Sequence, residues 1–575
     1  MAFPHFGADR RPDHIHTLGR PLPAKRGFLS IMENSFAVRG NIVDVVNARI
    51  FKGEICIKNG VTTSVTEKIV SENHYILPGL IDAHVHIESS MLIPSEFARL
   101  AFIQGTTATI SDPHEIANVL GMKGVMFMVD NGKKTPFKFN FGAPSCVPAT
   151  PFESAGAALG PAEIDQLLAM PEISYLAEMM NVPGVLHGDQ EVASKLASAK
   201  KYGKPVDGHA PGISGKDAEK YIQSGISTDH ECATLEEAKE KANLGMNILI
   251  REGSAAKNFD DLIDLIDTHP DQVMLCSDDK HPDDLLNGHI NALIKRGIAK
   301  GKDPIRMIRA ATVNPILHYK IKSGLIRVGD PADFIVVDDL KKFTVLKTFV
   351  DGILVAENGK CLIFRAKETP LNIFNAREIS VVDLEVKAES EKIRTIGVTD
   401  GQLYTKAIID NANIVGGKIV SDTRKDVLKL VVVNRYASEK PAIAFIHHMG
   451  IKKGAIASSV AHDSHNIIAT GVDDQDIVNA INLLIENKGG IVYVNGTEKL
   501  VLPLAVAGIM SADDGFEVAK LYSTINNKAL STGTDLKSPY MTLSFMALLV
   551  IPELKLSDKG LFDSLTFSFT TVCIS

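Results

Sequence analysis

The sequence predicts an α/β protein built on a (β/α)8 TIM-like barrel, with a small composite β domain from both flanks and a C-terminal α+β domain. Strand and helix patterns alternate between residues 77 and 321, which favours a parallel sheet. Eight such units over about 250 residues match the size of this barrel. A doubly wound open sheet is the alternative, but no glycine-rich dinucleotide loop follows the first strand.

The same patterns divide the chain into four parts. Residues 1–37 are expected to be a loosely ordered extension, because they are rich in basic residues and lack the apolar core of a signal peptide. Residues 38–76 and 322–384 alternate apolar and polar side chains around turn glycines, so we expect one small β domain from both. Residues 77–321 form the predicted barrel, and residues 385–575 form the C-terminal domain.

Composition argues against several classes of protein. Of 575 residues, 45% are hydrophobic and 23% are charged, which is typical of globular domains with sizeable cores. A net charge of -8 without a basic stripe argues against nucleic-acid binding. No apolar run reaches the roughly 18 residues of a membrane-spanning helix. The six scattered cysteines include no Cys-x-x-Cys pair, which favours a reducing, cytoplasmic location.

The predicted barrel strands end in side chains that can bind metal or substrate. Catalytic groups of such barrels lie at the carboxyl ends of the strands. The eight predicted strand ends lie near His86, Asp112, Pro144, Glu178, His209, His230, Glu252 and Asp278. Helical patterns lie between them, and residues 191–201 and 235–244 are the clearest examples.

The first strand ends in a histidine pair, His84 and His86, with one residue between them. Side chains alternate along a strand, so both imidazoles point to the same side and can bind one transition metal. Taken alone, such a pair is more typical of a solvated strand end. Asp278, with Asp279 beside it, follows a buried strand, and buried carboxylates need a cation or hydrogen bonds.

Three further ligand-type residues follow strands in the middle of the barrel. Glu178 ends an apolar strand, and His209 and His230 each follow a strand later in the chain. Any one of them alone could be a helix cap or a structural residue. Together, four histidines and two carboxylates from five strands suit two metal ions that share a hydroxide. We therefore expect a metal-dependent hydrolase.

Longer motifs resemble a known family. Residues 78–86, Pro-Gly-Leu-Ile-Asp-Ala-His-Val-His, resemble the signature of the amidohydrolase superfamily. Over roughly residues 38–570 the chain resembles the bacterial adenine deaminases specifically. The segments that carry this resemblance are residues 88–91, 112–116, 176–180, 250–256, 277–279, 459–466 and 550–556.

The resemblance implies a binuclear metal centre, with Mn²⁺ or Fe²⁺ commoner than Zn²⁺. The implied ligands are His84, His86 and Asp278 for one metal, His209 and His230 for the other, and Glu178 as the bridge. Many members of the superfamily use a carboxylated lysine as this bridge, whereas adenine deaminases have a glutamate. Histidine and carboxylate ligands suit several ions, so the sequence does not identify the metal.

The implied reaction is hydrolytic deamination of adenine to hypoxanthine and ammonia, in purine salvage. A metal pair lowers the pKa of bound water and holds hydroxide beside the ring. Asp278 would move the proton of this hydroxide toward the leaving ammonia, and Glu178 would protonate a ring nitrogen. Asp112 and Glu115 would bind ring nitrogens, or would instead be the N-cap and a first-turn carboxylate of the following helix. Arg251 would contact substrate or support the site.

Residues 462–466 of the C-terminal domain include His465 and follow a run of small residues, 454–459, that suits a mobile loop. We interpret them as a mobile lid through which His465 binds substrate, or alternatively as a polar surface turn. The competing functions are another amidohydrolase, acting on a cyclic amide or a different aminated heterocycle, and a non-catalytic metal-binding protein. A nucleic-acid deaminase is disfavoured, because its Cys-x-x-Cys zinc site is missing. The expected partner is adenine, without nucleic acid or membrane, and homo-oligomer formation stays open.

Overall fold

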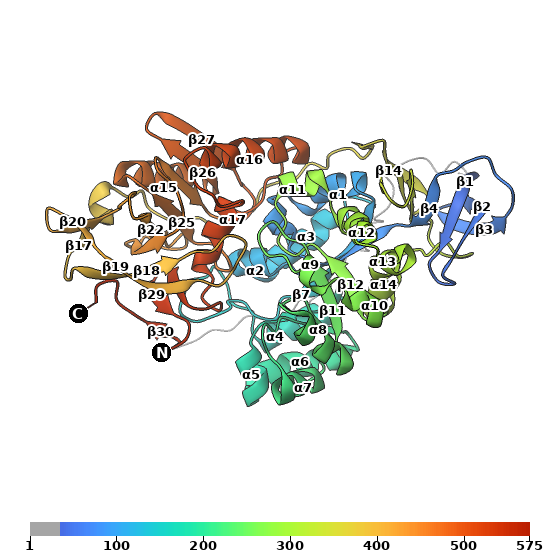
Figure 1. Cartoon of the computed structure of the whole chain (residues 1–575), viewed down its shortest axis with the longest axis horizontal. Helices are drawn as coiled ribbons and strands as arrows, with labels where there is room; N and C mark the ends of the chain where they lie inside the picture. Colours follow the sequence, from blue (N-terminus) through green and yellow to red (C-terminus); the bar gives the residue numbers. More distant parts are fainter. Residues whose placement is uncertain (1–34, 575) are drawn as a thin grey trace, which may run out of the picture.

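The computed structural model describes residues 35–574 and arranges them as a small sheet, a central barrel and a C-terminal domain, in a row (Figure 1). The extension predicted for residues 1–37 lies outside the described residues, apart from its last three, which begin strand β1 (Ser35–Asp44). Within the described part, no helix combines the length and the apolar character needed to cross a membrane.

Eight parallel strands form the central barrel, so the fold class predicted from the sequence is confirmed. The strands are β5 (Leu80–Val85), β6 (Thr106–Ser111), β7 (Lys138–Ala143), β8 (Ile173–Met179), β9 (Val206–Gly208), β10 (Thr228–Asp229), β11 (Asn247–Arg251) and β12 (Val273–Cys276). Each ends within two residues of its predicted position. The amide of Ser227 donates to the carbonyl of Val206 (3.0 Å), and that of Asp278 donates to the carbonyl of His84 (2.9 Å). These bonds join the two strand ladders and close the barrel, so the open-sheet alternative is wrong.

Helices surround the barrel strands. They are α1 (Pro94–Ile103), α2 (His114–Leu120), α3 (Met122–Gly132), α4 (Pro161–Leu168), α5 (Val182–His187), α6 (Gln190–Tyr202), α7 (Gly215–Gln223), α8 (Leu235–Asn243), α9 (Phe259–Leu262), α10 (Leu265–Thr268), α11 (Pro282–Asn287), α12 (Ile290–Ala299), α13 (Pro304–Ala310) and α14 (Val313–Tyr319). Helices α6 and α8 lie where the sequence predicts them. Side chains of Asp189 and Thr234 cap their first turns by accepting backbone N–H groups.

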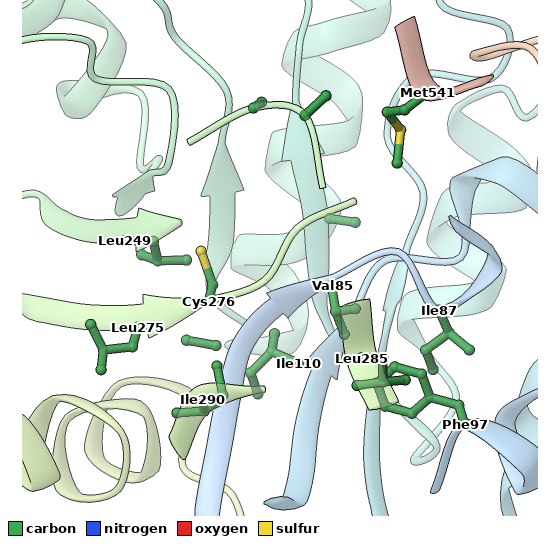
Figure 2. Close-up of a cluster of buried hydrophobic side chains, with 14 of the residues drawn as sticks. Val85, Ile87, Phe97, Ile110, Leu249, Leu275, Cys276, Leu285, Ile290 and Met541 are labelled. Atoms are coloured by element: carbon green, nitrogen blue, oxygen red, sulfur yellow. The ribbon is translucent and has the colours of Figure 1, made fainter. Parts of the chain in front are cut away.

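Apolar side chains between strands and helices form the core (Figure 2). Val85 and Ile110 come from strands, and Phe97 and Leu285 come from helices α1 and α11; each is at most 1% exposed. Met541 of the C-terminal domain belongs to the same continuous core. Because burial of apolar area drives this packing, the barrel and the C-terminal domain stabilise each other.

The small sheet takes strands from both flanks of the barrel. Its order is β16 (Lys360–Cys361), β15 (Ile353–Glu357), β14 (Val345–Val350), β13 (Phe334–Val337), β4 (Tyr75–Pro78), β1, β2 (Arg49–Lys58) and β3 (Val61–Glu67). Strand β4 joins the two flanks, because it pairs in parallel with β1 and antiparallel with β13. This sheet lies at the end of the molecule away from the C-terminal domain (Figure 1).

The C-terminal domain has one large sheet. Its order is β19 (Lys406–Asn411), β18 (Lys392–Gly397), β23 (Ala442–His447), β22 (Val427–Val433), β25 (Ile467–Gly471), β24 (Ala455–Ser458), β26 (Gly490–Asn495) and β27 (Glu498–Pro503). Helix α15 (Asp474–Asn487) packs on one face of the sheet. Helices α16 (Gly515–Leu530) and α17 (Pro539–Ser544) follow it. At the start of α16, Asp514 accepts from Arg99 of barrel helix α1 (2.8 Å), which anchors the domain to the barrel.

Candidate metal centre

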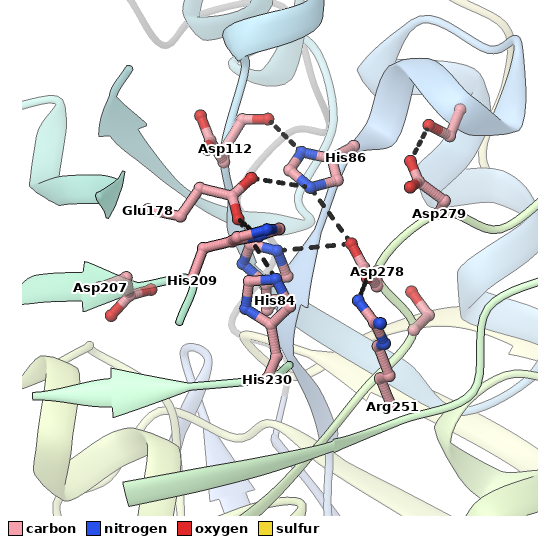
Figure 3. Close-up of polar contacts among 12 residues, drawn as sticks. His84, His86, Asp112, Glu178, Asp207, His209, His230, Arg251, Asp278 and Asp279 are labelled. Carbon is pink, nitrogen blue, oxygen red and sulfur yellow. Dashed lines mark hydrogen bonds and ion pairs between the residues drawn. The ribbon is translucent and has the colours of Figure 1, made fainter. Parts of the chain in front are cut away.

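The histidine pair lies at the carboxyl end of β5, with both side chains buried (Figure 3). The two rings are edge to face, with centroids 4.8 Å apart. Their Nε2 atoms lie 3.5 Å (His84) and 3.2 Å (His86) from the same oxygen, Oδ1 of Asp278. Neither ring nitrogen of His84 has a hydrogen-bond partner, although the side chain is 1% exposed. Buried polar atoms are normally paired, so this ring fits a metal ligand.

Asp278 has a backbone conformation that is uncommon for residues other than glycine. Its φ is +55°, in the left-handed region, and such conformations persist where the surrounding structure imposes them. The preceding residue, Ser277, donates its N–H to Asp82 (2.9 Å), and His289 donates Nε2–H to the same carboxylate (2.7 Å). These buried bonds fix the end of β12 and thereby the direction of Asp278.

Arg251 lies behind Asp278. Its guanidinium donates to Oδ2 of Asp278 (2.6 Å) and to both carboxylate oxygens of Glu231. Burial by itself raises the pKa of Asp278, but the charge of Arg251 and the contacts with His84 and His86 together outweigh burial and hold this pKa well below its usual value. Arg251 lines the cavity, and the described hydrogen bonds of its guanidinium go to these two carboxylates.

Glu178 stands between the two groups of histidines. Its Oε1 lies 3.3 Å from Nε2 of His86, while its Oε2 lies 3.0 Å from Nδ1 of His209 and 3.2 Å from Nε2 of His230. Burial raises the pKa of Glu178, but the hydrogen bonds and charges of His209 and His230 together outweigh burial and keep this pKa well below its usual value. A carboxylate whose two oxygens face different histidines has the arrangement that a bridging ligand needs.

The six predicted ligands therefore come together in overlapping groups. One group contains His84, His230 and Asp278, a second contains Glu178, His209 and His230, and a third contains His86, Asp278 and Asp279; in each, the ligand atoms lie within 4.8 Å of one another. These imidazole and carboxylate donors fit Mn²⁺, Fe²⁺ or Zn²⁺. Gly208 contributes by its lack of a side chain, since a Cβ there would lie 2.4 Å from the carbonyl oxygen of Thr228.

Two residues that we did not select from the sequence also belong to the site. His114 places Nδ1 3.4 Å from Oε1 of Glu178 and 3.0 Å from Oδ2 of Asp112. Glu231 places Oε1 3.4 Å from Nε2 of His230. Both adjoin predicted site residues in the chain, and His114 lies inside the 112–116 motif. Their positions next to site residues are the signal that could have found them.

Asp112 is not the N-cap of helix α2, so that part of the alternative is wrong, whereas Glu115 does lie in the first turn of this helix. Helix α2 begins after Pro113, and no side-chain hydrogen bond caps it. Asp112 instead pairs with His114, and its carbonyl oxygen lies 3.2 Å from Nδ1 of His86. Glu115 lines the cavity, whereas Asp112 does not. The two carboxylates thus occupy different places in the site.

Residues 462–466 are buried against the barrel, with every residue at most 3% exposed, so the surface-turn alternative is wrong. His462 contacts Oε1 of Glu115, and Nε2 of His465 lies 2.5 Å from Oε2 of the same carboxylate. His462 lines the cavity and His465 does not. The small-residue run before this segment forms the central strand β24, rather than the mobile loop that we expected.

A cavity adjoins the predicted ligands. Its polar lining includes His86, His114, Glu115, Glu178, His209, His230, Glu231, Arg251, Asp278, Asp279, His462 and Asp463. Its apolar lining consists of Met180 from the barrel and Leu403, Phe545, Leu548 and Val550 from the C-terminal domain. Both domains therefore build the pocket, whose mixed polarity suits a small-molecule site.

Two family models match separate parts of the chain. Residues 75–355 match the Amidohydrolase family. This match covers the barrel and all the predicted ligands, so the barrel is of the amidohydrolase class. Residues 402–568 match the Adenine deaminase C-terminal domain. The two matches together span the barrel and most of the C-terminal domain.

Curated relatives match nearly the whole chain. The adenine deaminase of Methanosarcina barkeri is 55% identical over 541 residues, which cover 92% of this chain and 98% of the relative. The adenine deaminase of Sulfurovum sp. is 53% identical, and that of Borreliella burgdorferi is 46% identical. Each of these two matches covers 93% of this chain and 99% of the relative. The chain belongs to the adenine deaminase family.

Proposed function

We propose that this chain hydrolyses adenine to hypoxanthine and ammonia at a centre of two divalent metal ions. The observation that carries this proposal is the position of Glu178, whose two carboxylate oxygens face different histidines. Asp278 faces the remaining histidine, His84, from the other side of the cluster. The identity to curated adenine deaminases over more than nine tenths of the chain supports adenine as the substrate.

The proposed ligands are His84, His86 and Asp278 for one ion, His209 and His230 for the other, and Glu178 for both. When bound, two divalent ions lower the pKa of water and supply a nucleophile at neutral pH. We propose Mn²⁺ or Fe²⁺ in preference to Zn²⁺. The free nitrogens of His84 support this use of the site, because an imidazole in an apolar core would normally be hydrogen-bonded.

The side chains around the cavity have complementary proposed roles. Asp278 accepts the proton of the attacking water and delivers it to the amino group that leaves from C6. Arg251 bonds to the other oxygen of Asp278, which keeps this carboxylate ionised and oriented. The histidines keep Glu178 ionised, so its proposed role is to take the other proton of the water and pass it to a ring nitrogen. Glu115 binds the ring edge, while Asp112 acts through His114, which it holds by a hydrogen bond.

The C-terminal domain encloses the substrate in this proposal. Residues 462–466 lie over the cavity, and His465 supports Glu115 from behind rather than touching the ring. Enclosure excludes bulk water and keeps adenine in position for attack at C6. We propose that the enzyme acts in the cytoplasm, in purine salvage. Six cysteines without disulfide bonds support that location.

An ammonia-release assay on metal-replete enzyme tests the proposal. Adenine should yield hypoxanthine and ammonia, and adenosine should react much more slowly, because its ribose has to fit the same enclosed cavity. A cyclic amide serves as the substrate of the competing amidohydrolase reaction. Turnover of the cyclic amide without turnover of adenine would contradict the proposal.

A further inference from the structure

The apolar wall of the cavity consists of Leu403, Phe545, Leu548 and Val550, all from the C-terminal domain. Phe545 stacks on His462, with ring centroids 4.8 Å apart and planes inclined by 20°. The flat faces of an aromatic heterocycle are apolar and its edge is polar. Such a ring is therefore bound well where apolar side chains meet its face and polar groups meet its edge.

Lys555 links two parts of this wall. It lies in strand β28 (Leu554–Ser557) and is 0% exposed. Its Nζ donates to the carbonyl oxygen of Leu403 (2.8 Å) and to that of Phe545 (2.9 Å). Nearby, the hydroxyl of Thr405 donates to the carbonyl oxygen of Leu554 (2.8 Å). The segments that carry Leu403 and Phe545 are far apart in the chain, so these bonds fix their relative positions.

The surroundings of Lys555 do not suggest an ion pair. Its described hydrogen bonds go only to backbone carbonyls, and burial alone lowers its pKa, to about 7. A buried amine without a carboxylate partner costs free energy. It does not line the cavity either, so it does not touch the substrate. Its two hydrogen bonds to the wall are therefore the contribution that the structure assigns to it.

We propose that Lys555 is a positioning residue for substrate binding, which holds Leu403 and Phe545 so that the apolar wall meets the face of the adenine ring. This inference rests on the proposed function and adds to it the source of ring recognition. The barrel then supplies the metal ligands and the groups that meet the polar edge. The C-terminal domain supplies the apolar wall that meets the face of the ring, and the amine of Lys555 sets the distance between Leu403 and Phe545 in this wall.

Lys555→Met tests the inference, because methionine keeps the length and apolar stem of lysine but cannot donate to the two carbonyls. We expect the KM for adenine to rise by about tenfold, with a smaller change in kcat and two metals still bound per chain. The inhibition constant of hypoxanthine, measured as a product inhibitor, should rise by the same factor because the product shares the ring.

Lys429→Met is the matched control. Lys429 is a second buried lysine of the same domain, 1% exposed, which donates to the carbonyl oxygen of Leu384 (2.8 Å) and to Asp474. It does not line the cavity. Its replacement should lower the Tm but leave KM and the hypoxanthine inhibition constant unchanged. Wild-type values in Lys555→Met, or equal increases in both variants, would overturn the inference.

Leu548→Ala tests the wall itself, and decides the matter if Lys555→Met does not accumulate as folded protein. Removing this side chain should raise the KM for adenine and the hypoxanthine inhibition constant while metal content stays constant. Unchanged constants would overturn the inference. Failure of wild-type, metal-replete enzyme to deaminate adenine would instead contradict the proposed function, so the two failures are distinguishable.

Discussion

His84 shows most directly what a single buried side chain implies. Its two ring nitrogens are enclosed without hydrogen-bond partners, and Asp278 and the ring of His230 lie beside it. His84→Ala should therefore lose bound metal and activity together. Metal analysis of the purified variant, beside its rate of ammonia release, checks this. Full metal content in His84→Ala would show that this residue is not a ligand.

Asp278 is expected to move a proton as well as to bind metal. In Asp278→Asn the side chain keeps its shape but loses the charge that accepts the proton. The kcat should fall by about 10² to 10⁴-fold, which is typical for a lost general base, while the Tm changes little. Steady-state kinetics and thermal unfolding on the same preparation check this. Near-normal turnover with full metal content would exclude the proton-transfer role.

Lys555 should give a pH dependence of stability with a definite sign. Burial lowers its pKa to about 7 in the folded state, whereas the unfolded chain keeps the usual lysine value of about 10.4. Between these values the unfolded state binds more protons, so stability rises with pH. The Tm difference between wild type and Lys555→Met should therefore change in favour of the wild type from pH 7 to pH 9.5. A constant difference would mean that Lys555 titrates normally.

The sequence predicts residues that act from strand ends better than residues that act from packing. His84, His86, Glu178 and Asp278 follow apolar strands, and the alternation of side chains is enough to bring them to one end of the barrel. Lys555 could not be predicted in the same way. Lysine is normally exposed, and only the packing of distant segments makes this one buried.

The segment of residues 462–466 acts through Glu115, whose two oxygens face His462 and His465. His465→Ala should lower kcat/KM for adenine with two metals still bound, because Glu115 loses one of its supports. His447→Ala is the control, since this histidine pairs with Asp410 away from the cavity. Unchanged kinetics in His465→Ala would show that His465 does not support Glu115 in catalysis. Loss of metal would mean that the ligand set is incomplete.

The strands and helices themselves were largely predictable, and the exception has a physical cause. The run of small residues in β24 suggested a mobile loop. In the structure β24 is paired on both sides, with β25 and β26, and lies under helix α15. Small side chains suit a strand that is covered on a face by a close-packed helix. Composition alone does not separate this situation from a flexible loop.

At the scale of the whole molecule, the barrel and the C-terminal domain contribute different parts of the site. The barrel brings the predicted ligands together at the ends of its strands, and the C-terminal domain adds the apolar wall and the residues behind Glu115. Sequence patterns predicted both domains, because each has its own alternation of strands and helices. How the domains meet depends on contacts such as that of Arg99 with Asp514, for which local patterns carry no signal.

Titration of metal-free enzyme with Mn²⁺ or Fe²⁺, followed by ammonia release from adenine, tests the binuclear centre most directly. The proposed set of six ligands includes one carboxylate that bridges two ions. We therefore expect activity to rise until two ions are bound per chain and then to stay constant. Full activity at one ion per chain, or two bound ions without adenine turnover, would contradict the account.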